Sequence, residues 1–325
     1  MHHYIDEVKS QYQKLKPYIR KTPILPWESD LFDKRSAVYL KCELFQKTAT
    51  FKLRGVLSRL LNLTDKEKAQ GVIAGTGGNH GIALAYGASI LNIHSTIIIP
   101  KSINPLRLKR IQAYAQKVIE VESINDVLET MHHLAAKENK TMIHPFDHPL
   151  TTLGSATLAY EWLNELPNLD VLLIATGGGG LLSGVAKYAK LFNPKIQVYG
   201  VEPELAPTMS LSFKENKPMK LKAGALSIAD SLNAPNTLEY SFSIAKTYVD
   251  DMILVSDSEI KKAMSLLAQE KNLICEPASA TTTAALIGPL KDRLSNVRVG
   301  NLLCGSNIDL QTFYQYCSEV DPILS

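Results

Sequence analysis

A chain of 325 residues is long enough to bury two hydrophobic cores, and its hydrophobic content of 45% is that of a globular protein. The 35 Lys and Arg residues nearly balance the 32 Asp and Glu residues, so the net charge of +3 gives no electrostatic case for binding nucleic acid or a membrane surface. The N-terminus lacks the apolar core of a signal peptide, and no run approaches the ~20 apolar residues that cross a bilayer. The four cysteines have no metal-ligand spacing, so we expect reduced thiols in the cytoplasm.

In chain order, the apolar periodicity predicts helices that alternate with strands. An amphipathic helix at residues 3–16 leads into an extended segment at 21–24, and a strand at 38–43 precedes a helix at 51–63. Further strands are predicted at 72–74, 95–100, 117–121, 141–143, 171–175, 197–202, 252–255 and 297–303. Further helices are predicted at 79–91, 105–115, 125–138 and 150–166, from Leu181 onward, and after a capping box at Ser256–Glu259. Residues 213–247 show no pattern that we can assign.

This alternation is typical of α/β proteins, in which helices cover both faces of parallel sheets. The length suits two such units, yet no linker rich in Pro, Gly or Ser separates them. A missing linker is expected if one domain is inserted within the other. We therefore predict two doubly wound domains with mostly parallel sheets, a large one at residues 1–60 and 149–325 and a small inserted one at 61–148.

Four consecutive glycines, Gly177, Gly178, Gly179 and Gly180, separate the apolar strand at 171–175 from the helix that starts at Leu181. A strand, a glycine loop and a helix N-terminus bring several N–H donors and a positive dipole end to one place, which favours an anion such as phosphate. The alternative is a flexible tight turn. The loop matches neither the GxGxxG pattern nor a P-loop, so a dinucleotide or a nucleoside triphosphate is not favoured.

A second glycine-rich loop, Gly75–Gly81, follows the strand at 72–74. Its N–H groups at a helix start can bind a carboxylate or a phosphate, and the amide of Asn79 can hold a phenolic or carbonyl oxygen. The alternative is a glycine turn that Asn79 merely caps.

Two further side chains are candidates for chemistry. Lys52 lies at a helix start, where the dipole lowers the pKa of a lysine as a Schiff base requires, although a solvated surface lysine is the alternative. Cys304 ends the last strand, where its thiol can meet a neutral heterocyclic nitrogen or be ordinary core. Together with the glycine loops, these residues describe a phosphate-bearing aldehyde cofactor linked to a lysine.

The chain resembles the fold type II (tryptophan-synthase-β-like) pyridoxal-phosphate enzymes, within them the serine/threonine dehydratase and serine racemase group. The resemblance rests on five motifs in order: Lys41–Thr48, Phe51-Lys52, Gly78–Gly81, the tetraglycine and Cys304. It implies that Lys52 is the catalytic Schiff-base lysine, and that the large domain binds pyridoxal 5'-phosphate while the small domain carries the loop for the substrate carboxylate. The implied cofactor-binding residues are Phe51, Lys52, Asn79, Gly177, Gly178, Gly179, Gly180 and Cys304, and the implied substrate-binding residues are Thr76, Gly77, Gly78, Asn79 and His80.

Some positions of this sequence depart from the family pattern, and these positions distinguish between dehydratases and racemases. Racemases of this group carry a serine as second acid/base just before Gly-Asn-His-Gly, and here that position is Gly77, which favours elimination. Phe146, in His144–Asp147, resembles the dehydratase version of its segment. The racemase-type metal site corresponds to Glu202, Ala206 and Thr208, so one anionic oxygen is missing and no metal is expected. Ser231 stands where relatives usually carry glycine.

The resemblance thus implies a lyase that deaminates L-threonine or L-serine by β-elimination of water, giving 2-oxobutyrate or pyruvate plus ammonia. Lys52 would remove the Cα proton before the β-hydroxyl leaves. The alternatives are a serine racemase, a 3-hydroxyaspartate or phenylserine ammonia-lyase, a threonine synthase-like enzyme or, in another class, a non-catalytic pyridoxal-phosphate or amino-acid binding protein. We expect a small amino acid as substrate, no nucleic-acid or membrane partner, and a cytoplasmic homodimer.

Overall fold

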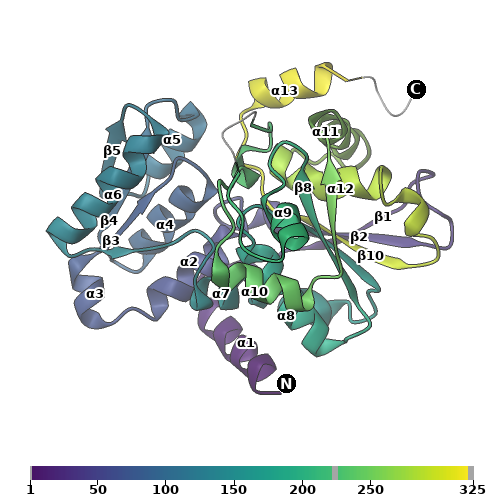
Figure 1. Cartoon of the computed structure of the whole chain (residues 1–325), viewed down its shortest axis with the longest axis horizontal. Helices are drawn as coiled ribbons and strands as arrows, with labels where there is room; N and C mark the ends of the chain where they lie inside the picture. The colour runs from purple at the N-terminus through teal and green to yellow at the C-terminus, as the bar shows by residue number, and fades with distance from the viewer. Residues whose placement is uncertain (1, 222–225, 321–325) are drawn as a thin grey trace.

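Two β-sheets organise the chain in a computed structural model that describes residues 2–221 and 226–320 (Figure 1). The larger sheet contains, in spatial order, β1 (Ile24–Trp27), β2 (Ala37–Cys42), β10 (Arg298–Leu303), β7 (Val171–Ala175), β8 (Gln197–Pro203) and β9 (Asp251–Val255). The smaller sheet contains β5 (Lys117–Val121), β4 (Ser95–Pro100), β3 (Val72–Gly75) and β6 (Thr141–Met142). Every pairing is parallel except that of β1 with β2, so the predicted α/β fold with mostly parallel sheets is confirmed.

The helices join these strands and cover the sheets. They are α1 (His2–Leu15), α2 (Lys52–Leu61), α3 (Asp65–Gln70), α4 (Asn79–Ile90), α5 (Pro105–Gln112), α6 (Ile124–Glu138), α7 (Pro149–Glu165), α8 (Gly180–Phe192), α9 (Thr208–Glu215), α10 (Glu239–Tyr248), α11 (Asp257–Lys271), α12 (Pro277–Ile287) and α13 (Leu310–Ser318). Short 3-10 turns lie at η1 (Glu43–Phe45), η2 (Asp230–Leu232) and η3 (Lys291–Arg293). No helix in this part of the chain combines the length and apolar character that crossing a bilayer requires.

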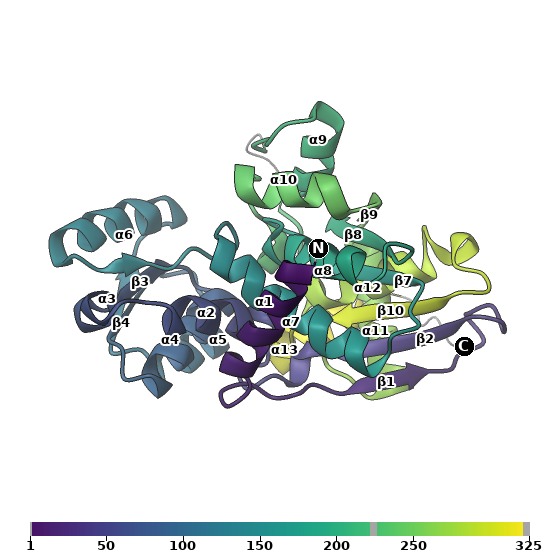
Figure 2. The same ribbon diagram turned by 90° about the horizontal axis from the view of Figure 1, so that it is seen from below.

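The two sheets lie side by side, with the smaller one formed by residues between β2 and β7 of the larger. In both views the smaller sheet and α3–α6 lie to one side, and α2 and α7 run between it and the larger sheet (Figure 2). Helix α2 packs against α7 and also against α4, so it contacts both halves. The domain limits near residues 60 and 149 stay a prediction.

The nine predicted strands match β2–β10 to within one residue, whereas β1 was expected only as an extended segment at 21–24. The capping box at the start of α11 is present as predicted. The helices α3, α9, α10, α12 and α13 were not predicted. Helix α3 has no buried residue, so it carries no apolar stripe. Ten of the eleven residues of helix α12 are buried and most of them are small, which leaves little contrast between its faces.

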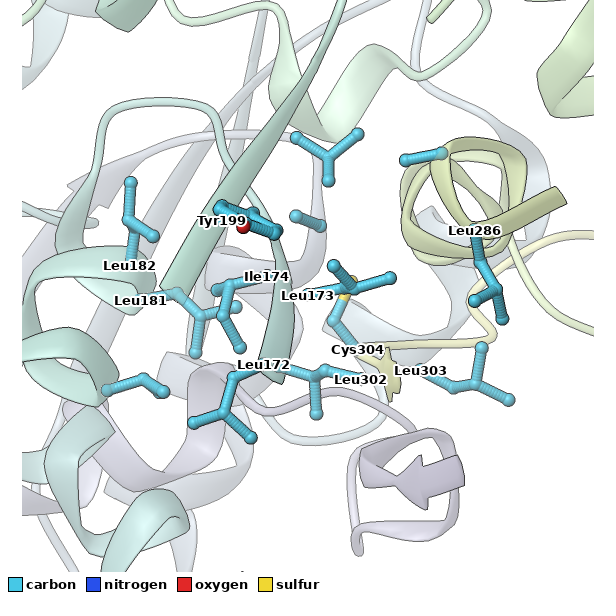
Figure 3. Packing of buried hydrophobic residues seen from close by; sticks show 14 of the residues in the cluster. Leu172, Leu173, Ile174, Leu181, Leu182, Tyr199, Leu286, Leu302, Leu303 and Cys304 are labelled. Atoms are coloured by element: carbon cyan, nitrogen blue, oxygen red, sulfur yellow. The ribbon is translucent and has the colours of Figure 1, made fainter. Parts of the chain in front are cut away.

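The central strand β7 is buried on both faces of the larger sheet. Leu172, Leu173 and Ile174 have no exposed surface. Leu182 of α8 and Leu286 of α12 lie on opposite sides of this strand, which Figure 3 shows together with Leu302 and Leu303 of β10. A strand held in this way fixes the point at which the tetraglycine loop leaves the sheet.

A cluster of buried charges lies beneath the start of α2, where this helix meets β2 and α7. The guanidinium of Arg54 donates to Glu43 at 2.8 and 2.9 Å and to Glu161 of α7 at 3.1 Å. The ammonium of Lys41 donates to Glu161 at 2.6 Å and to the carbonyl of Thr22 at 2.8 Å. Burial disfavours the charged form of Glu161, yet Arg54 and Lys41 lower its pKa overall. Two cations and two carboxylates therefore neutralise one another in a place where water does not solvate them.

Replacing Glu161 by Gln keeps the side-chain shape but leaves Lys41 and Arg54 with one carboxylate between them. We expect the free energy of unfolding to fall by about 3 kcal/mol, the usual scale for breaking a buried ion pair. Urea unfolding followed by circular dichroism measures the change. The control is Glu165→Gln in the same helix, whose partner Lys21 lies at 2.6 Å but at the surface, and which should change stability by less than about 1 kcal/mol. Equal effects of the two substitutions would contradict a structural role for the cluster.

Candidate active site

The predicted site residues meet in two adjoining cavities between the sheets. The larger cavity, of about 630 Å³, is lined by Thr76, Gly77, Gly78, Asn79 and His80. The smaller one is lined by Phe51, Cys304 and the four glycines at 177–180. Lys52, Asn79, Phe146, Gly178 and Ser231 line both, so the two cavities are continuous. The fold thus brings together every residue that the sequence nominated.

Lys52 is the first residue of α2, and its amine lies inside this site. Its Nζ donates to the carbonyl of Pro145 at 2.9 Å and lies 5.1 Å from the centre of the Phe51 ring. The N–H of Phe51 donates to the carbonyl of Cys304 at 3.0 Å, which ties the start of α2 to the end of β10. Burial lowers the pKa of Lys52 to about 8, although Cys304 and Glu276 act in the opposite direction. Near neutral pH this amine is therefore unprotonated far more often than an ordinary lysine, as a nucleophile or base requires.

The tetraglycine loop needs bare backbone because two segments press against it. A Cβ on Gly178 would lie 2.4 Å from the ring of Phe146, and one on Gly180 would lie 2.6 Å from the Phe146 carbonyl oxygen. Gly179 has a φ of +90° and precedes the 13-residue helix α8. None of the hydrogen bonds among the described residues uses the N–H of Gly177, Gly178 or Gly179. These donors, at the positive end of α8, suit an anion such as a phosphate group.

The loop at Thr76–His80 provides backbone N–H groups for binding an anion, and no charged side chain. The Thr76 hydroxyl accepts a hydrogen bond from the N–H of Gly78 at 3.2 Å, which shapes the turn before α4. The Nε2 of His80 donates to the carbonyl of Ile143 at 2.8 Å. Burial lowers the pKa of His80 to about 3, so its ring is neutral at physiological pH. A carboxylate in this loop would meet N–H groups at a helix start and no imidazolium.

Asn79 is held in one orientation by its neighbours. Its Nδ2 donates to Glu276 at 2.6 Å and to the hydroxyl of Ser231 at 3.2 Å, while its Oδ1 accepts from the amide of Asn307. Both Nδ2 hydrogens therefore have acceptors already. An oxygen on a cofactor ring would compete with Ser231 for one of them.

Glu276 belongs to the site and was not predicted from the sequence. It precedes α12, has 1% of its surface exposed, and leaves Oε2 without a hydrogen-bond partner among the described residues. Burial raises the pKa of Glu276 to about 7, although the nearby Arg107 lowers it. The Glu-Pro pair at a helix start was the available signal, but the helix itself gave no pattern.

At the position of the racemase-type metal site, the side chains of Glu202 and Thr208 form hydrogen bonds with neighbouring residues. Glu202 is buried and accepts from the N–H of Met209 at 2.7 Å and from the N–H and hydroxyl of Ser210 at 2.8 and 2.7 Å. The Thr208 hydroxyl donates to the carbonyl of Ala234 at 2.8 Å. Glu202 thus satisfies the first turn of α9 instead of facing an ion. No group of three His, Cys, Asp or Glu that could hold a metal exists within residues 2–221 and 226–320.

The site fits a phosphate-bearing aldehyde with a heterocyclic ring. It offers an amine of lowered pKa at Lys52 and a bare-backbone loop at a helix N-terminus. At Cys304, burial raises the pKa of the thiol well above its usual range, so the side chain stays neutral and can face an uncharged ring nitrogen. These are the groups that the resemblance assigns to pyridoxal phosphate.

Comparisons with known proteins agree with this chemistry. Residues 15–305 match the family model described as pyridoxal-phosphate dependent enzyme. The chain is 41% identical to phenylserine dehydratase of Ralstonia pickettii, over 93% of each chain, and 34% identical to serine racemase of Schizosaccharomyces pombe, over 97% of each. A solved structure of threonine deaminase from Solanum lycopersicum superposes with a TM-score of 0.90 at 26% identity, covering 98% of this chain and 92% of that one. The chain belongs to the family of pyridoxal-phosphate dependent enzymes.

Proposed function

We propose that the enzyme is an ammonia-lyase that converts β-hydroxy amino acids to 2-oxo acids and ammonia, by β-elimination of water followed by hydrolysis, with L-threonine and L-serine as its simplest substrates. The observation that carries the proposal is Gly77, which lines the same cavity as Lys52 and has no side chain to donate a proton. Two relatives support the same reaction class, one a phenylserine dehydratase and the other a threonine deaminase.

The cofactor would be held at three points of the chain. The N–H groups of the loop at 177–180 would bind its phosphate, the thiol of Cys304 would face its ring nitrogen, and the amide of Asn79 would contact its ring oxygen. Phe51 would pack beside it. When bound, pyridoxal phosphate supplies an electron sink for the negative charge that develops at the substrate Cα.

The reaction then depends on where protons can go. The loop at Thr76–His80 would bind the substrate carboxylate through its N–H groups and hold Cα within reach of Lys52. A pKa near 8 suits the Lys52 amine to remove the Cα proton at neutral pH. Because Gly77 offers no proton at the position where racemases of this group carry serine, Cα would not be protonated from that side. The β-hydroxyl would leave as water instead, and hydrolysis of the released enamine would give the 2-oxo acid and ammonia.

We also propose that the enzyme acts in the cytoplasm as a homodimer. The cytoplasm is supported by the cysteines, because Cys42, Cys275, Cys304 and Cys317 are all free thiols. The homodimer rests on the family resemblance, and size-exclusion chromatography with light scattering tests it.

Replacing Lys52 by Ala should abolish ammonia release from L-serine, because no other amine lies at the start of α2. Borohydride reduction and peptide mapping of the unmodified enzyme should place the reduced cofactor on Lys52. The control is Lys47→Ala, five residues earlier and exposed, which should keep both activity and label. A label on Lys47 or Lys101 would overturn the assignment of Lys52.

The phosphate loop is tested by adding charge at Gly178. Gly178→Asp places a carboxylate beside a phosphate dianion, so the affinity for pyridoxal phosphate should fall by about 2 kcal/mol, about thirtyfold. Gly178→Ala is the control, since its Cβ makes the same close approach to Phe146 without the charge. Equilibrium dialysis with absorbance detection measures both variants. If the Asp variant retains cofactor as well as the Ala variant, the loop does not bind the phosphate.

The absence of a second proton donor predicts the fate of L-serine. Wild-type enzyme should form pyruvate with little D-serine, and Gly77→Ser should raise the D-serine fraction, because a hydroxyl then faces Cα. A Cβ at this position would lie 3.1 Å from the end of the flexible Ile103 side chain, so the substitution fits with a small adjustment. Chiral chromatography and a coupled pyruvate assay measure both products, with Gly77→Ala as the control for size. D-serine formed by wild-type enzyme as fast as pyruvate would contradict a one-base site.

A further inference from the structure

One wall of the larger cavity, around Arg107 and Asp230, has no role in the proposed reaction. Arg107, on α5 beside the smaller sheet, reaches across the cavity to Asp230 in η2. Both terminal nitrogens of the guanidinium donate to the two carboxylate oxygens, one of them at 3.0 Å. Its Nε donates to the carbonyl of Asn307 at 3.2 Å, and NH2 lies 3.8 Å from Glu276. Each nitrogen of this guanidinium therefore has an oxygen acceptor.

The position of this ion pair matches the place of the substrate side chain. Lys52 must reach Cα, and the loop at Thr76–His80 must hold the α-carboxylate, so these two features occupy one end of the cavity. The remaining lining includes Ser102, Ile103, Arg107, Asp230, Ala234 and Pro235. By elimination, the group attached to Cβ of the substrate faces this wall.

The wall offers no free positive charge. Among the described residues that line the cavity, Lys52 and Arg107 are the only Lys or Arg side chains, and His80 is kept neutral by burial. Lys52 is committed to the cofactor and to Cα. Arg107 is paired with Asp230, whose side chain is about half exposed to the cavity and solvent. A carboxylate on the substrate Cβ would lose its hydration and meet an acidic side chain without gaining a free cation.

We propose that Asp230 is a specificity-determining residue: by pairing with Arg107 it makes the cavity accept β-hydroxy amino acids with uncharged β-substituents and reject those with a β-carboxylate. This inference rests on the proposed lyase function and names the substrate class of the same site. The apolar members of the wall, Ile103, Ala234 and Pro235, together with the adjoining Phe146 ring, give an uncharged substituent surface to pack against.

The sharpest test uses two substrates of the same shape that differ only in charge. L-threo-3-hydroxyaspartate carries a β-carboxylate, and L-threo-3-hydroxyasparagine carries the neutral amide in its place. For wild-type enzyme we expect kcat/KM for ammonia release to be at least about tenfold lower for the acid. In Asp230→Asn the charge of Arg107 is released, so the ratio should shift toward the acid by about tenfold or more.

Two further variants give an opposite change and a control. Arg107→Gln leaves Asp230 without its partner, so the ratio should move the other way, toward the amide. Asp251→Asn removes a carboxylate from an exposed pair with Arg293, at 3.1 Å, and should leave the ratio unchanged. A wild-type enzyme that uses the acid as well as the amide, or an Asp230→Asn variant with the wild-type ratio, would overturn the proposal.

Binding without turnover gives an independent readout. L-Aspartate and L-asparagine lack the β-hydroxyl, and the absorbance change of the bound cofactor reports their dissociation constants. Wild-type enzyme should bind L-asparagine more tightly, and Asp230→Asn should narrow or reverse the difference. If no hydroxy amino acid yields ammonia but this discrimination holds, the proposed lyase function fails while Asp230 keeps its role. If L-serine is deaminated and no discrimination is found, the lyase function stands and the role of Asp230 fails.

Discussion

The active site depends on the charge-compensated cluster beneath the start of α2. Arg54 lies two residues after Lys52 on the same helix, and its guanidinium is anchored to Glu43 and Glu161. Lys41 and Thr22 complete the cluster from β2 and the segment before β1. A buried cluster of this kind is favourable only when every charge is matched, so it tolerates one arrangement of these elements. The start of α2, and with it the Lys52 amine, is fixed by that requirement.

Two further constraints keep the cavities in shape around this amine. Phe146 packs so closely on Gly178 and Gly180 that the glycine loop and the His144–Asp147 segment determine each other's position. On the opposite side, Asn79 is fixed by Glu276, Ser231 and Asn307 together. The shape of the site is thus determined by contacts between segments that are far apart in the sequence.

The sequence predicted those parts of the fold and site whose signal is local. The strands β3, β4, β7 and β8 are apolar runs bounded by turns, and the tetraglycine is visible without any partner. Helix α12 could not be predicted, because a helix buried all round has no periodicity, and Glu276 was missed with it. Arg107 was not singled out, because an arginine on a short helix is usually solvated, and Asp230 lies in the stretch without a pattern. These two residues are far apart in the sequence and pair only in the folded chain, so no local sequence feature predicts the pair.

The two loops that we propose to bind anions belong to different sheets. The loop at Thr76–His80 continues β3 of the smaller sheet, whereas the loop at 177–180 continues β7 of the larger one. A ligand that reaches both loops must carry a carboxylate and a phosphate. The distance between these two groups, set by an amino acid joined to the cofactor, must match the distance between the loops. Ligands of the wrong length would engage one loop and leave the other empty. The spacing of the sheets would thereby select for α-amino acids, independently of the groups that perform the chemistry.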